Sequence, residues 1–321
     1  MSTKVIVTGA SGFIGTRMVG KLVDQGLSVI ALDILPPRVR RDGVAYHQVD
    51  LRDPIPTEIG AGVDRIYNFA AVHRTPGHPD WEYYQTNIAG ALNVVALAEA
   101  NQIATIVFTS SISVYGPSEA VVDEGSILKP VSAYGRSKRL AEQIHEQWRR
   151  SAEGRRLVVV RPAVVFGPGE RGNYTSLSKA LRGGYFFYPG RRDTIKSGGY
   201  VDELCRALDF ALSRNAPYIL FNFAYPDFST TEDIVAAFKS VTGWRANPPT
   251  LPIFPLLVAA TLFEIAAKLG LKTPIHRERV MKLVNSTKVA PGWLRANGYV
   301  FETDLAAALK SWAEETRGSF E

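Results

Sequence analysis

The stretch Val7–Gly15, VTGASGFIG, decides the fold predicted for this chain. Gly9, Gly12 and Gly15 stand between the β-branched run KVIVT and the helical pattern FIGTRMVGKLVDQG. Glycines at these positions allow a tight turn and let backbone amides approach a pyrophosphate at the N-terminus of a helix. The spacing G-x-x-G-x-x-G differs by one residue from the commoner dinucleotide fingerprint. With a strand before it and a helix after it, the motif predicts a dinucleotide-binding turn, and a turn without a ligand is the alternative.

Short apolar runs alternate with helical patterns through the first half of the chain. Strands are predicted for KVIVT, SVIALD, AYHQVD, RIYNFAA, ATIVFTSS and LVVVRPAVVF, and helices for FIGTRMVGKLVDQG, NIAGALNVVALAEAN and AYGRSKRLAEQIHEQWRR. Near-continuously apolar strands separated by helices indicate a parallel sheet that is covered on both faces. The sequence therefore predicts an α/β fold of the Rossmann type, a doubly wound parallel sheet whose ligand lies beyond the carboxyl ends of its strands.

The character of the sequence changes at Gly167. Loops become longer, glycine and proline cluster in FGPGERGN and YPGRRDTIKSGG, and helical patterns dominate with few strands between them. We therefore predict a dinucleotide-binding domain over residues 1–166 and, over residues 167–321, mainly a smaller, mostly helical substrate-binding lobe. Late sheet elements such as YILFNFA interleave with this lobe, so the chain is expected to cross between the two parts more than once.

The composition is that of a soluble globular protein, with 46% apolar and 21% charged residues among 321. The formal charge of +6 comes from scattered Lys and Arg without a long basic run, which favours a solvated surface over a nucleic-acid partner. Attraction of an anionic small molecule is the functional alternative. Cys205 is the one cysteine, so neither an internal disulfide nor a cysteine zinc cluster is expected, and no metal is predicted. This cysteine usage, with no signal-peptide pattern, favours the cytoplasm.

The most apolar segment is LPIFPLLVAATLFEIAAKLG, which starts at Leu251. Prolines interrupt its start, and Glu264 and Lys268 enter at its end. The apolar run Leu256–Phe263 between them is far shorter than the ~20 residues that a membrane-spanning helix needs. The segment therefore predicts a buried or capping helix and no integral membrane span, with peripheral contact to a membrane surface as the alternative.

An acidic residue ends the second predicted strand, because Asp33 falls 18 residues after the last glycine of the turn. A carboxylate there accepts hydrogen bonds from the adenosine ribose hydroxyls and repels a 2′-phosphate. Asp33 therefore favours NAD over NADP, and a plain strand-end cap is the alternative. Arg38, Arg40 and Arg41 follow closely and can compensate for the carboxylate, which leaves NADP open.

Asp50 and Leu51 close the third predicted strand. A carboxylate at that strand end can meet the adenine amino group of a bound dinucleotide. The run DLRD is equally consistent with an ordinary solvated turn, so both interpretations stay open.

Tyr134 and Lys138, in YGRSK, stand one turn apart on a predicted helix, which places both side chains on one face. A free tyrosine, with a pKa of ~10, is a poor base at neutral pH. A neighbouring ammonium and a positively charged nicotinamide both favour the phenolate and lower that pKa. The pair is therefore predicted to move the proton of a substrate hydroxyl, and a decorative helix pair is the alternative.

Four motifs, TGASGFIG, NFAA, TSSISVYG and YGRSK, together resemble the extended short-chain dehydrogenase/reductase family. The subgroup they resemble most is its nucleotide-sugar epimerases, dehydratases and reductases, typified by UDP-galactose 4-epimerase. The resemblance implies Tyr134 and Lys138 as catalytic residues, with Ser111, four residues before Tyr115, as the catalytic Ser/Thr. Asn87 matches an asparagine that supports the family's site from behind. The predicted contacts of the NAD cofactor are Gly9, Ser11, Gly12, Phe13, Ile14, Gly15, Asp33, Asp50, Leu51, Ala70, Ala71, Tyr134, Lys138 and Pro162.

The resemblance also implies a substrate side, because family members hold a nucleotide diphosphate with basic and amide side chains from the second half of the chain. Asn173 begins a predicted helix where the family often places an amide near the diphosphate. Lys196 stands where the family has a diphosphate-binding arginine, so a point charge replaces a bidentate fork. For the cations, an ordinary surface role is the alternative. For His73, the stronger alternative is a loop histidine that makes local hydrogen bonds. The predicted substrate contacts are His73, Ser111, Asn173, Lys196, Arg277 and Arg279.

Two departures from the family pattern narrow the expected reaction. The epimerases bring an asparagine toward the sugar nucleotide at the position of Val164, so diphosphate binding is expected to differ in detail. The 4,6-dehydratases carry an Asp-Glu pair directly after the catalytic Ser/Thr, where this chain has Ile112 and Ser113. Dehydration is therefore not expected. The resemblance predicts an NAD(P)-dependent 4-epimerase or 4-keto-reductase that acts on a nucleotide-diphosphate sugar.

Two other functions compete with this one. A reductase or dehydrogenase of an apolar alcohol or ketone, like the hydroxysteroid and dihydroflavonol enzymes, is favoured by RPAVVFGPG and the apolar segment, but an uncharged substrate needs no phosphate clamp. A non-catalytic NAD-sensing protein is disfavoured because it has no need of the tyrosine base. The family commonly pairs the helices that match residues 87–101 and 133–150 across a dimer, so the resemblance also implies a homodimer.

Overall fold

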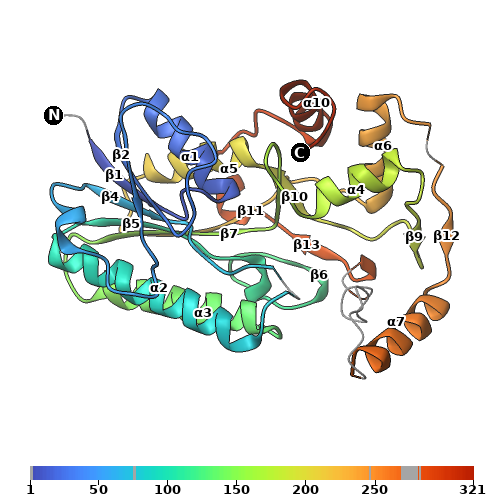
Figure 1. Ribbon diagram of the computed structural model, residues 1–321, viewed down its shortest axis with the longest axis horizontal. Coiled ribbons are helices and arrows are strands. Elements are labelled where there is room, and N and C mark those ends of the chain that lie inside the picture. The colour runs from blue at the N-terminus through green and yellow to red at the C-terminus, as the bar shows by residue number, and fades with distance from the viewer. Residues whose placement is uncertain (1–2, 75–76, 246, 269–280, 282) are drawn as a thin grey trace.

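A computed structural model describes residues 3–74, 77–245, 247–268, 281 and 283–321. Its centre is a seven-stranded sheet in the order β3-β2-β1-β4-β5-β7-β11, and every neighbouring pair of strands is parallel (Figure 1). The strands are β1 Lys4–Thr8, β2 Ser28–Asp33, β3 Val44–Gln48, β4 Arg65–Asn68, β5 Thr105–Thr109, β7 Arg156–Pro162 and β11 Tyr218–Phe223. The order reverses between β1 and β4, which is the switch point where dinucleotides bind in this fold class. The predicted Rossmann-type α/β fold is confirmed.

Helices cover both faces of this sheet (Figure 1). On one face lie α1, Phe13–Asp24, and α5, Val201–Leu212, and on the other lie α2, Asp80–Ala100, and α3, Ala133–Arg150. Alternate residues of one strand enter two different cores, since Val5 and Val7 pack with α1 and α5 whereas Ile6 packs with α2 and α3. Strands buried on both faces must be apolar throughout, which explains the near-continuous apolar runs of the sequence.

Several predicted elements differ from the structure by a few residues at their ends, and two differ by more. The helix predicted from Asn87 begins at Asp80, directly after Pro79 at its N-cap. The run LVVVRPAVVF, predicted as one strand, forms β7 and then β8, Val164–Phe166, which leaves the large sheet and pairs with β10, Gly198–Tyr200. Proline has no N–H for a ladder hydrogen bond, so Pro162 is a natural end for β7.

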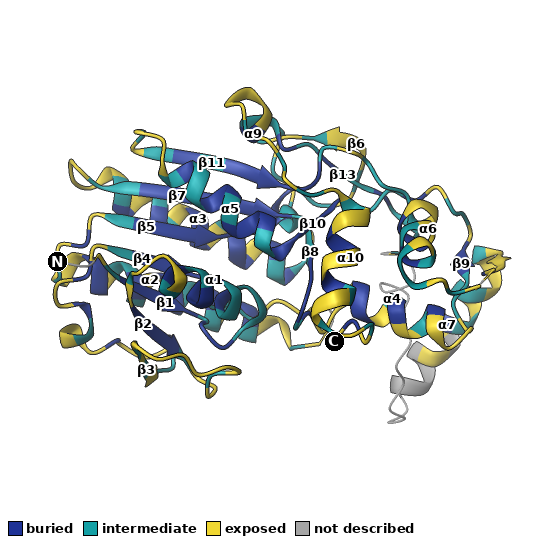
Figure 2. Ribbon diagram, turned by 90° about the horizontal axis from the view of Figure 1, so that it is seen from above, coloured by how far each residue is buried: buried dark blue, intermediate teal, exposed yellow. Residues whose placement is uncertain are grey.

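A smaller lobe adjoins the carboxyl ends of the strands (Figure 2). Three of its helices, α4 Asn173–Arg182, α6 Thr231–Thr242 and α10 Leu305–Glu315, enclose an aromatic core. That core includes Phe166, Tyr174, Tyr200, Phe238, Trp312 and Phe320. The remaining elements are β6 Ser118–Val122, β9 Tyr188–Pro189, β12 Thr250–Leu251, β13 Thr287–Val289, α7 Ile253–Lys268, α9 Gly292–Ala296 and the 3-10 turns Thr57–Gly60 and Ile112–Val114. Because β11 and α5 return to the sheet, the lobe is interleaved with it, and the division at residue 166 stays a prediction.

The apolar segment after Leu251 forms α7 but not the buried helix that was predicted. Phe254 is 74% exposed and Val258 44% exposed, whereas Ala260 is buried. Figure 2 shows α7 at the outer end of the lobe, with exposed residues along it. An apolar sequence shows that a segment is able to be buried, and the surrounding elements decide whether it is. Across the described residues, no helix combines the length and apolarity required to cross a membrane.

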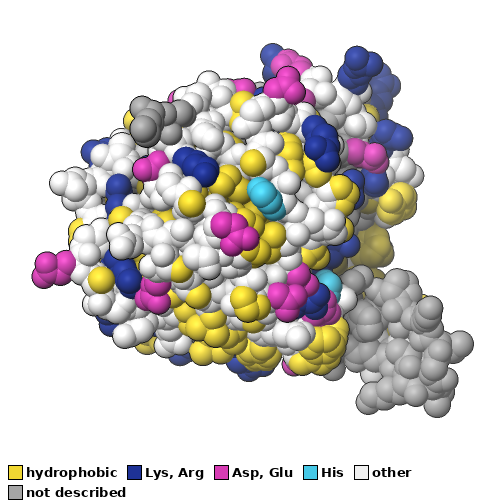
Figure 3. All heavy atoms as spheres, turned by 60° about the vertical axis from the view of Figure 1, so that its left-hand side comes forward, with side chains coloured by type: hydrophobic (Ala, Val, Ile, Leu, Met, Phe, Trp, Pro, Cys, Tyr) yellow, Lys and Arg dark blue, Asp and Glu magenta, His cyan; other side chains and the backbone are white. Residues whose placement is uncertain are grey.

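The charged side chains are dispersed over the part of the surface that Figure 3 shows. Basic and acidic residues are interspersed there among apolar and uncharged ones. This face agrees with the interpretation of the +6 charge as a solvated surface.

Candidate active site

The glycine turn joins β1 to α1 at the switch point. Gly9 has φ +66°, and a Cβ there would lie 2.7 Å from the backbone nitrogen of Ala70. At Gly15 a Cβ would lie 2.1 Å from the carbonyl oxygen of Gly9. The chain is therefore packed too closely for side chains at either position. No side chain caps the N-terminus of α1 at Gly12, so the amides of its first turn, at Phe13 and Ile14, are open to a pyrophosphate.

Asp33 lies at the end of β2, directly beside the glycine turn. Its carboxylate accepts hydrogen bonds of 2.9 Å from the backbone N–H groups of Ser11 and Leu35. The Ser11 hydroxyl in turn donates to the Leu35 carbonyl at 2.9 Å. The carboxylate is thereby fixed next to the turn, which is where an adenosine ribose is held in this fold class.

The three arginines that left NADP open do not share one environment. Arg40 stacks over the Tyr46 ring, and Arg41 forms an ion pair of 2.9 Å with Asp24. Arg38 donates to the carbonyl of Gly169 at 2.7 Å. Two of the three are therefore engaged away from Asp33, which supports the preference for NAD.

The other predicted cofactor contacts flank this turn or close nearby strands. Ala70 and Ala71 follow β4, and Ala70 packs against Gly9. Leu51 is buried in the core beside α2. The Asp50 carboxylate accepts two hydrogen bonds from the Arg52 guanidinium, so the ordinary-turn interpretation of DLRD has direct support. Pro162 ends β7, buried at the same edge of the sheet.

The predicted catalytic tyrosine and serine meet at the carboxyl edge of the sheet. Tyr134 lies in the first turn of α3, and the Ser111 side chain, which follows β5, is close enough to its phenol to oppose the rise that burial causes in the Tyr134 pKa. The Tyr134 ring lies 6.2 Å from the ring of the buried Tyr83 on α2. Ser111 Oγ also lies 3.1 Å from both the backbone N–H and the hydroxyl of Ser113. Two oxygens that can share one substrate hydroxyl are therefore side by side.

Lys138 lies one turn further along α3 and is buried. Its ammonium donates to the Thr109 carbonyl at 2.7 Å and stands 4.8 Å from the centre of the Phe108 ring. Burial lowers the pKa of Lys138 to about 7, and the nearby Glu142 carboxylate partly offsets that shift. The cation is thus held at the base of the site by a backbone oxygen and an aromatic face.

The predicted lowering of the tyrosine pKa is not found in the polypeptide alone. Burial raises the pKa of Tyr134 to about 12, and the Ser111 side chain opposes this only in part. The nearby Tyr83 raises that pKa further. The physical reason is that desolvation disfavours the phenolate, and the nicotinamide of the prediction is not part of the polypeptide.

Asn87 braces this arrangement from α2. Its side-chain amide donates to the Ser137 hydroxyl at 2.9 Å and to the Val72 carbonyl at 3.2 Å, and its oxygen accepts from Val72 N–H. Ser137 donates in turn to the carbonyl of Tyr134 at 2.9 Å. The asparagine therefore ties the segment after β4 to the first turn of α3, as the resemblance implied.

The sequence analysis missed a buried polar network behind Lys138. Arg161 on β7 donates to both carboxylate oxygens of Glu142 at 2.8 Å and to the Tyr115 hydroxyl at 3.0 Å. Tyr115 donates to the side-chain oxygen of Asn222 on β11 at 2.7 Å. The signal was present, because an arginine inside the apolar strand LVVVRP requires a buried partner. Its partner is 19 residues away, and the sequence does not identify it.

His145 is a buried histidine on α3, further along the helix than Lys138. His145 stacks on Phe108 with ring centres 4.3 Å apart, and burial lowers its pKa to about 4. One ring nitrogen lies 2.7 Å from the Ala141 carbonyl and the other 3.3 Å from the Asn68 amide. His145 is therefore neutral at physiological pH and part of the packing around Lys138.

The predicted substrate residues fall into two groups. His73 follows β4 and is exposed; desolvation lowers its pKa, and Lys138 is among the charges that lower it further. Asn173 and Lys196 lie on the lobe instead. Asn173 begins α4 with an exposed side chain. Burial lowers the pKa of Lys196 to about 8, and its ammonium donates to the Asn285 carbonyl.

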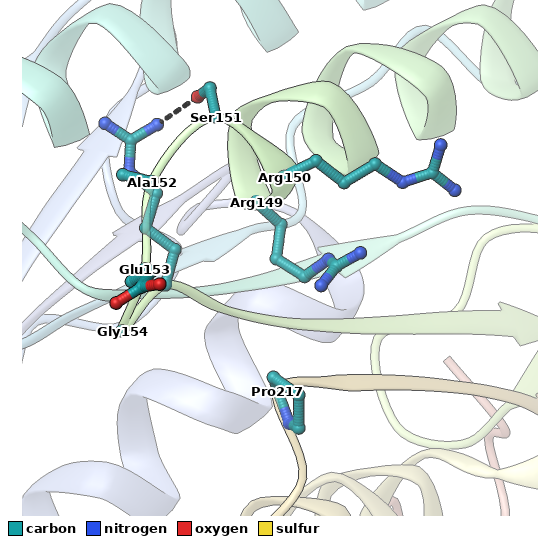
Figure 4. A pocket seen from close by; sticks show the side chains of 8 residues that line it. Arg149, Arg150, Ser151, Ala152, Glu153, Gly154 and Pro217 are labelled. Atoms are coloured by element: carbon teal, nitrogen blue, oxygen red, sulfur yellow. Dashed lines mark hydrogen bonds between the residues drawn. The ribbon is translucent and has the colours of Figure 1, made fainter.

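Arg277 and Arg279 lie outside the described residues, so their predicted contacts with the substrate stay predictions. An open pocket of about 580 Å³ is also distinct from this site (Figure 4). Its lining is Arg149, Arg150, Ser151, Ala152, Glu153, Gly154, Arg155 and Pro217. It lies at the C-terminal end of α3, about 24 Å along the helix from Tyr134. The pocket therefore takes no part in the chemistry at Tyr134.

A dinucleotide turn, with a phenol, a hydroxyl and an ammonium at the same sheet edge, defines the class of nicotinamide-dependent hydride-transfer enzymes. Residues 5–223 match the NAD dependent epimerase/dehydratase family, and the chain belongs to this family. It is 30% identical over 318 residues to N-acetyl-alpha-D-glucosaminyl-diphospho-ditrans,octacis-undecaprenol 4-epimerase from Escherichia coli O157:H7, an alignment that covers 96% of this chain and 94% of that protein.

Two solved structures extend the comparison. A UDP-galactose 4-epimerase structure is 25% identical with a TM-score of 0.68, and the match covers 98% of this chain and 99% of that one. The structure of MoeE5 in complex with UDP-glucose and NAD is 23% identical with a TM-score of 0.77 and covers 99% and 100%, which shows the shared fold. The matches confirm the predicted family, an enzymatic function and NAD as cofactor, and favour the sugar-epimerase prediction over the apolar-substrate alternative.

Proposed function

We propose that the protein is a 4-epimerase that interconverts the two C4 epimers of a sugar carried on a nucleoside diphosphate. The observation that carries the proposal is the placement of the Tyr134 phenol next to the Ser111 hydroxyl, with the buried Lys138 one turn further along α3. The Escherichia coli relative, which aligns over 94% of its length, is named as a 4-epimerase of a diphosphate-linked sugar. Relatives named as reductases align over less of this chain, 84% and 67% of it against 96%.

The roles of the site residues follow from their positions. Tyr134 takes the proton of the C4 hydroxyl and later returns it, while Ser111 hydrogen-bonds the same oxygen and stabilises its developing charge. The chemistry that bound NAD supplies is hydride acceptance from C4 and return of the hydride to the opposite face of the ketone. Lys138 holds a positive charge below the phenol, and Asn87 fixes the first turn of α3. Ile112 and Ser113 offer no acid–base pair, so water is not eliminated.

The phenol depends on additional positive charge to act as a base. The pKa of Tyr134 is about 12 in the polypeptide, because burial disfavours the phenolate. Protonated Lys138 and the positively charged nicotinamide both stabilise that anion. The base is therefore active when the oxidised cofactor is in place, which couples proton removal to hydride removal.

The remaining contacts are assigned by their place around this centre. The glycine turn and Asp33 hold the pyrophosphate and the adenosine ribose, and His73 faces the sugar. Asn173 and Lys196, from the lobe, serve the diphosphate. Lys196 has a pKa of about 8 and is still mainly protonated at neutral pH, as a phosphate ligand must be.

An epimer-exchange assay tests the proposal. The protein is incubated with NAD and with UDP-, GDP- and dTDP-sugars, and the C4 epimers are separated. We expect epimer to form without net production of NADH. Tyr134→Phe reduces turnover at least about 100-fold and leaves NAD affinity unchanged, since the ring remains and only the acid–base group is lost. Net oxidation of NADPH with no epimer would establish a reductase instead.

We further propose a homodimer formed through α2 and α3 and a cytoplasmic location. Leu92 on α2 and Leu140 on α3 are exposed apolar side chains on helices that pack side by side. Leu92→Glu separates the protomers if these helices form the interface, and light scattering after gel filtration measures the mass. The location is supported by the single, buried and unpaired Cys205, which suits a reducing compartment.

A further inference from the structure

The first part of α7, residues 253–263, is apolar on its exposed side as well as elsewhere, and Glu264 and Lys268 follow it. Phe254, Pro255 and Val258 are exposed, while Ala260 is buried. Thr261 is the one polar residue between Ile253 and Phe263. A helix that is apolar all round is typical of burial or of membrane contact, because water disfavours both of its sides. Phe254 and Val258 are one turn apart and make a continuous apolar surface.

We propose that α7 docks on the surface of an anionic phospholipid bilayer and thereby presents the active site to sugars carried on a lipid diphosphate. Phe254 and Val258 enter the boundary between headgroups and acyl chains, and the helix lies in the plane of the membrane. This inference rests on the proposed epimerase function and extends its substrates. A lipid diphosphate and a nucleoside diphosphate offer the same two phosphates and the same glycosyl bond to the site.

The position of α7 suits this role because it lies close to the proposed diphosphate contacts. A Cβ at Gly190 would lie 3.3 Å from the Cβ of Ile253, so the chain passes directly against the first turn of α7. Lys196 follows Gly190 by six residues, which span at most about 20 Å when fully extended. A diphosphate held near Lys196 is therefore within reach of a bilayer that α7 touches.

Two cations beside α7 match the charge of anionic headgroups. Arg191 and Arg192 directly follow Gly190, and both side chains are partly exposed. Each also has other partners: Arg191 donates to the Ser286 hydroxyl at 2.7 Å, and Arg192 donates to the Thr250 hydroxyl at 2.8 Å. Their ion pairs with the exposed carboxylates of Glu119 and Glu232, at 3.4 Å and 3.3 Å, are weak, so phospholipid phosphates can replace these carboxylates.

A bilayer fits this surface better than a second copy of the chain. Two copies meeting at α7 bring two Arg191–Arg192 pairs together in a protein of formal charge +6, and like charges repel. The Escherichia coli relative is named for a substrate with an undecaprenol carrier, which resides in membranes because of its long apolar chain. Apolarity, charge and this relative therefore point to the same occupant.

Co-sedimentation with vesicles tests the docking surface directly. The full chain is mixed with vesicles of phosphatidylcholine and phosphatidylglycerol, or of phosphatidylcholine alone, at low and high salt. We expect binding to the anionic vesicles that weakens with salt, and weaker binding to the neutral ones. Phe254→Ser with Val258→Ser reduces the partition at least about 10-fold, because two apolar side chains no longer enter the bilayer.

Matched variants control for the loss of exposed apolar side chains elsewhere. Val300→Ser and Ile127→Ser remove side chains that are 79% and 75% exposed away from α7, and both variants are expected to bind vesicles like the parent. Equal loss in the controls, or unchanged binding of the α7 double variant, overturns the proposal. A change of oligomeric state in the double variant without a change in vesicle binding assigns α7 to a second copy and also overturns it.

Activity separates this inference from the proposed function. In detergent, epimerisation of polyprenyl-diphosphate-linked N-acetylglucosamine is expected from both the parent and the double variant, whereas on vesicles the double variant alone loses it. Vesicle binding without epimerisation of any glycosyl diphosphate refutes the proposed function and leaves docking intact. Epimerisation of nucleotide sugars without vesicle binding refutes docking alone.

Discussion

Arg161 and Glu142 form a buried, two-pronged ion pair, with both N–O distances at 2.8 Å. Glu142 lies one helical turn after Lys138 on α3, and its carboxylate raises the pKa that burial lowers. The pair therefore does more than join β7 to α3. The Glu142 carboxylate favours the protonated form of Lys138, which lies beside Tyr134. Residues behind the active site therefore influence the charge within it.

Glu142→Gln is the sharpest test of that relationship. It leaves Arg161 buried without its anion, which costs about 3–5 kcal/mol of unfolding free energy. It also removes the charge that raises the Lys138 pKa, so the alkaline limb of the pH–activity profile moves to lower pH. Denaturant unfolding and the pH dependence of kcat measure the two effects.

Glu146→Gln is the matched control for this substitution, because Glu146 pairs with Arg139 and Arg150 nearer the surface. Its effect on unfolding is expected to stay within about 1 kcal/mol. If Glu142→Gln does not change the pH dependence of kcat, the buried ion pair has only a structural role.

Lys138 should make the stability of the protein depend on pH. Its pKa is about 7 in the fold, below the ordinary value of 10.5, so the unfolded chain binds more protons between these limits. Stability therefore rises with pH across that window, and the full penalty applies below it. Lys138→Met removes the penalty and is expected to stabilise the protein by roughly 3–5 kcal/mol in mild acid, with little effect above pH ~10, while abolishing turnover.

Melting temperatures of the parent and of Lys138→Met across this pH range measure the effect. The difference between the two proteins should shrink steadily as pH rises. A difference that stays constant with pH contradicts a buried, depressed lysine. Lys179→Met, which removes an exposed lysine of the lobe, provides the control and should show no such trend.

Gly15→Ala is expected to abolish NAD binding and to destabilise the fold. The new Cβ would lie 2.1 Å from the Gly9 carbonyl oxygen, so the turn that receives the pyrophosphate must shift. Overpacking of this kind costs about 1–3 kcal/mol. Gly20→Ala on the same helix is the control, because its Cβ meets the flexible Arg41 side chain and alanine favours helix. Quenching of protein fluorescence by NAD, together with thermal melting, distinguishes the two variants.

Asp33→Asn should relax the choice of cofactor. The amide keeps the shape of the carboxylate but loses the charge that repels a 2′-phosphate, so the ratio of the Kd for NADP to that for NAD is expected to fall about tenfold. Asp24→Asn, which removes the carboxylate that pairs with Arg41, should leave the ratio unchanged. If the ratio is unchanged in Asp33→Asn, the Asp33 carboxylate serves only to accept the hydrogen bonds from Ser11 and Leu35 and does not select the cofactor.

The features that the sequence predicted well depend on short-range physics. The glycine turn is recognised from a local motif between a strand and a helix, and α3 has its predicted bounds because Ser132 accepts a hydrogen bond from Gly135 N–H at its N-cap. The parallel sheet followed from strands that are apolar on both sides. In each case a local pattern has one physical solution.

The features that the sequence did not predict depend on partners far along the chain. The position of Arg161 inside an apolar strand indicated that it has a buried partner. Only the packing of α3 on β7 identifies that partner as Glu142. The sign of the Tyr134 pKa shift depended on how much protein surrounds the phenol. The spacing of residues along the sequence does not reveal this. The exposure of Phe254 and Val258 depended on which elements pack against α7, and an apolar run in the sequence does not report this.

The last strand of the sheet has a consequence for how such enzymes diversify. β11 lies beyond β7 at the edge of the sheet, yet its residues follow β8, α4 and β10 in the chain. The lobe therefore cannot be exchanged as one continuous segment of the chain. Removal of the chain after β7 also removes β11 and exposes the apolar edge of β7. New substrates are therefore expected to be acquired by substitution of side chains in place, which leaves the strand order of the sheet intact.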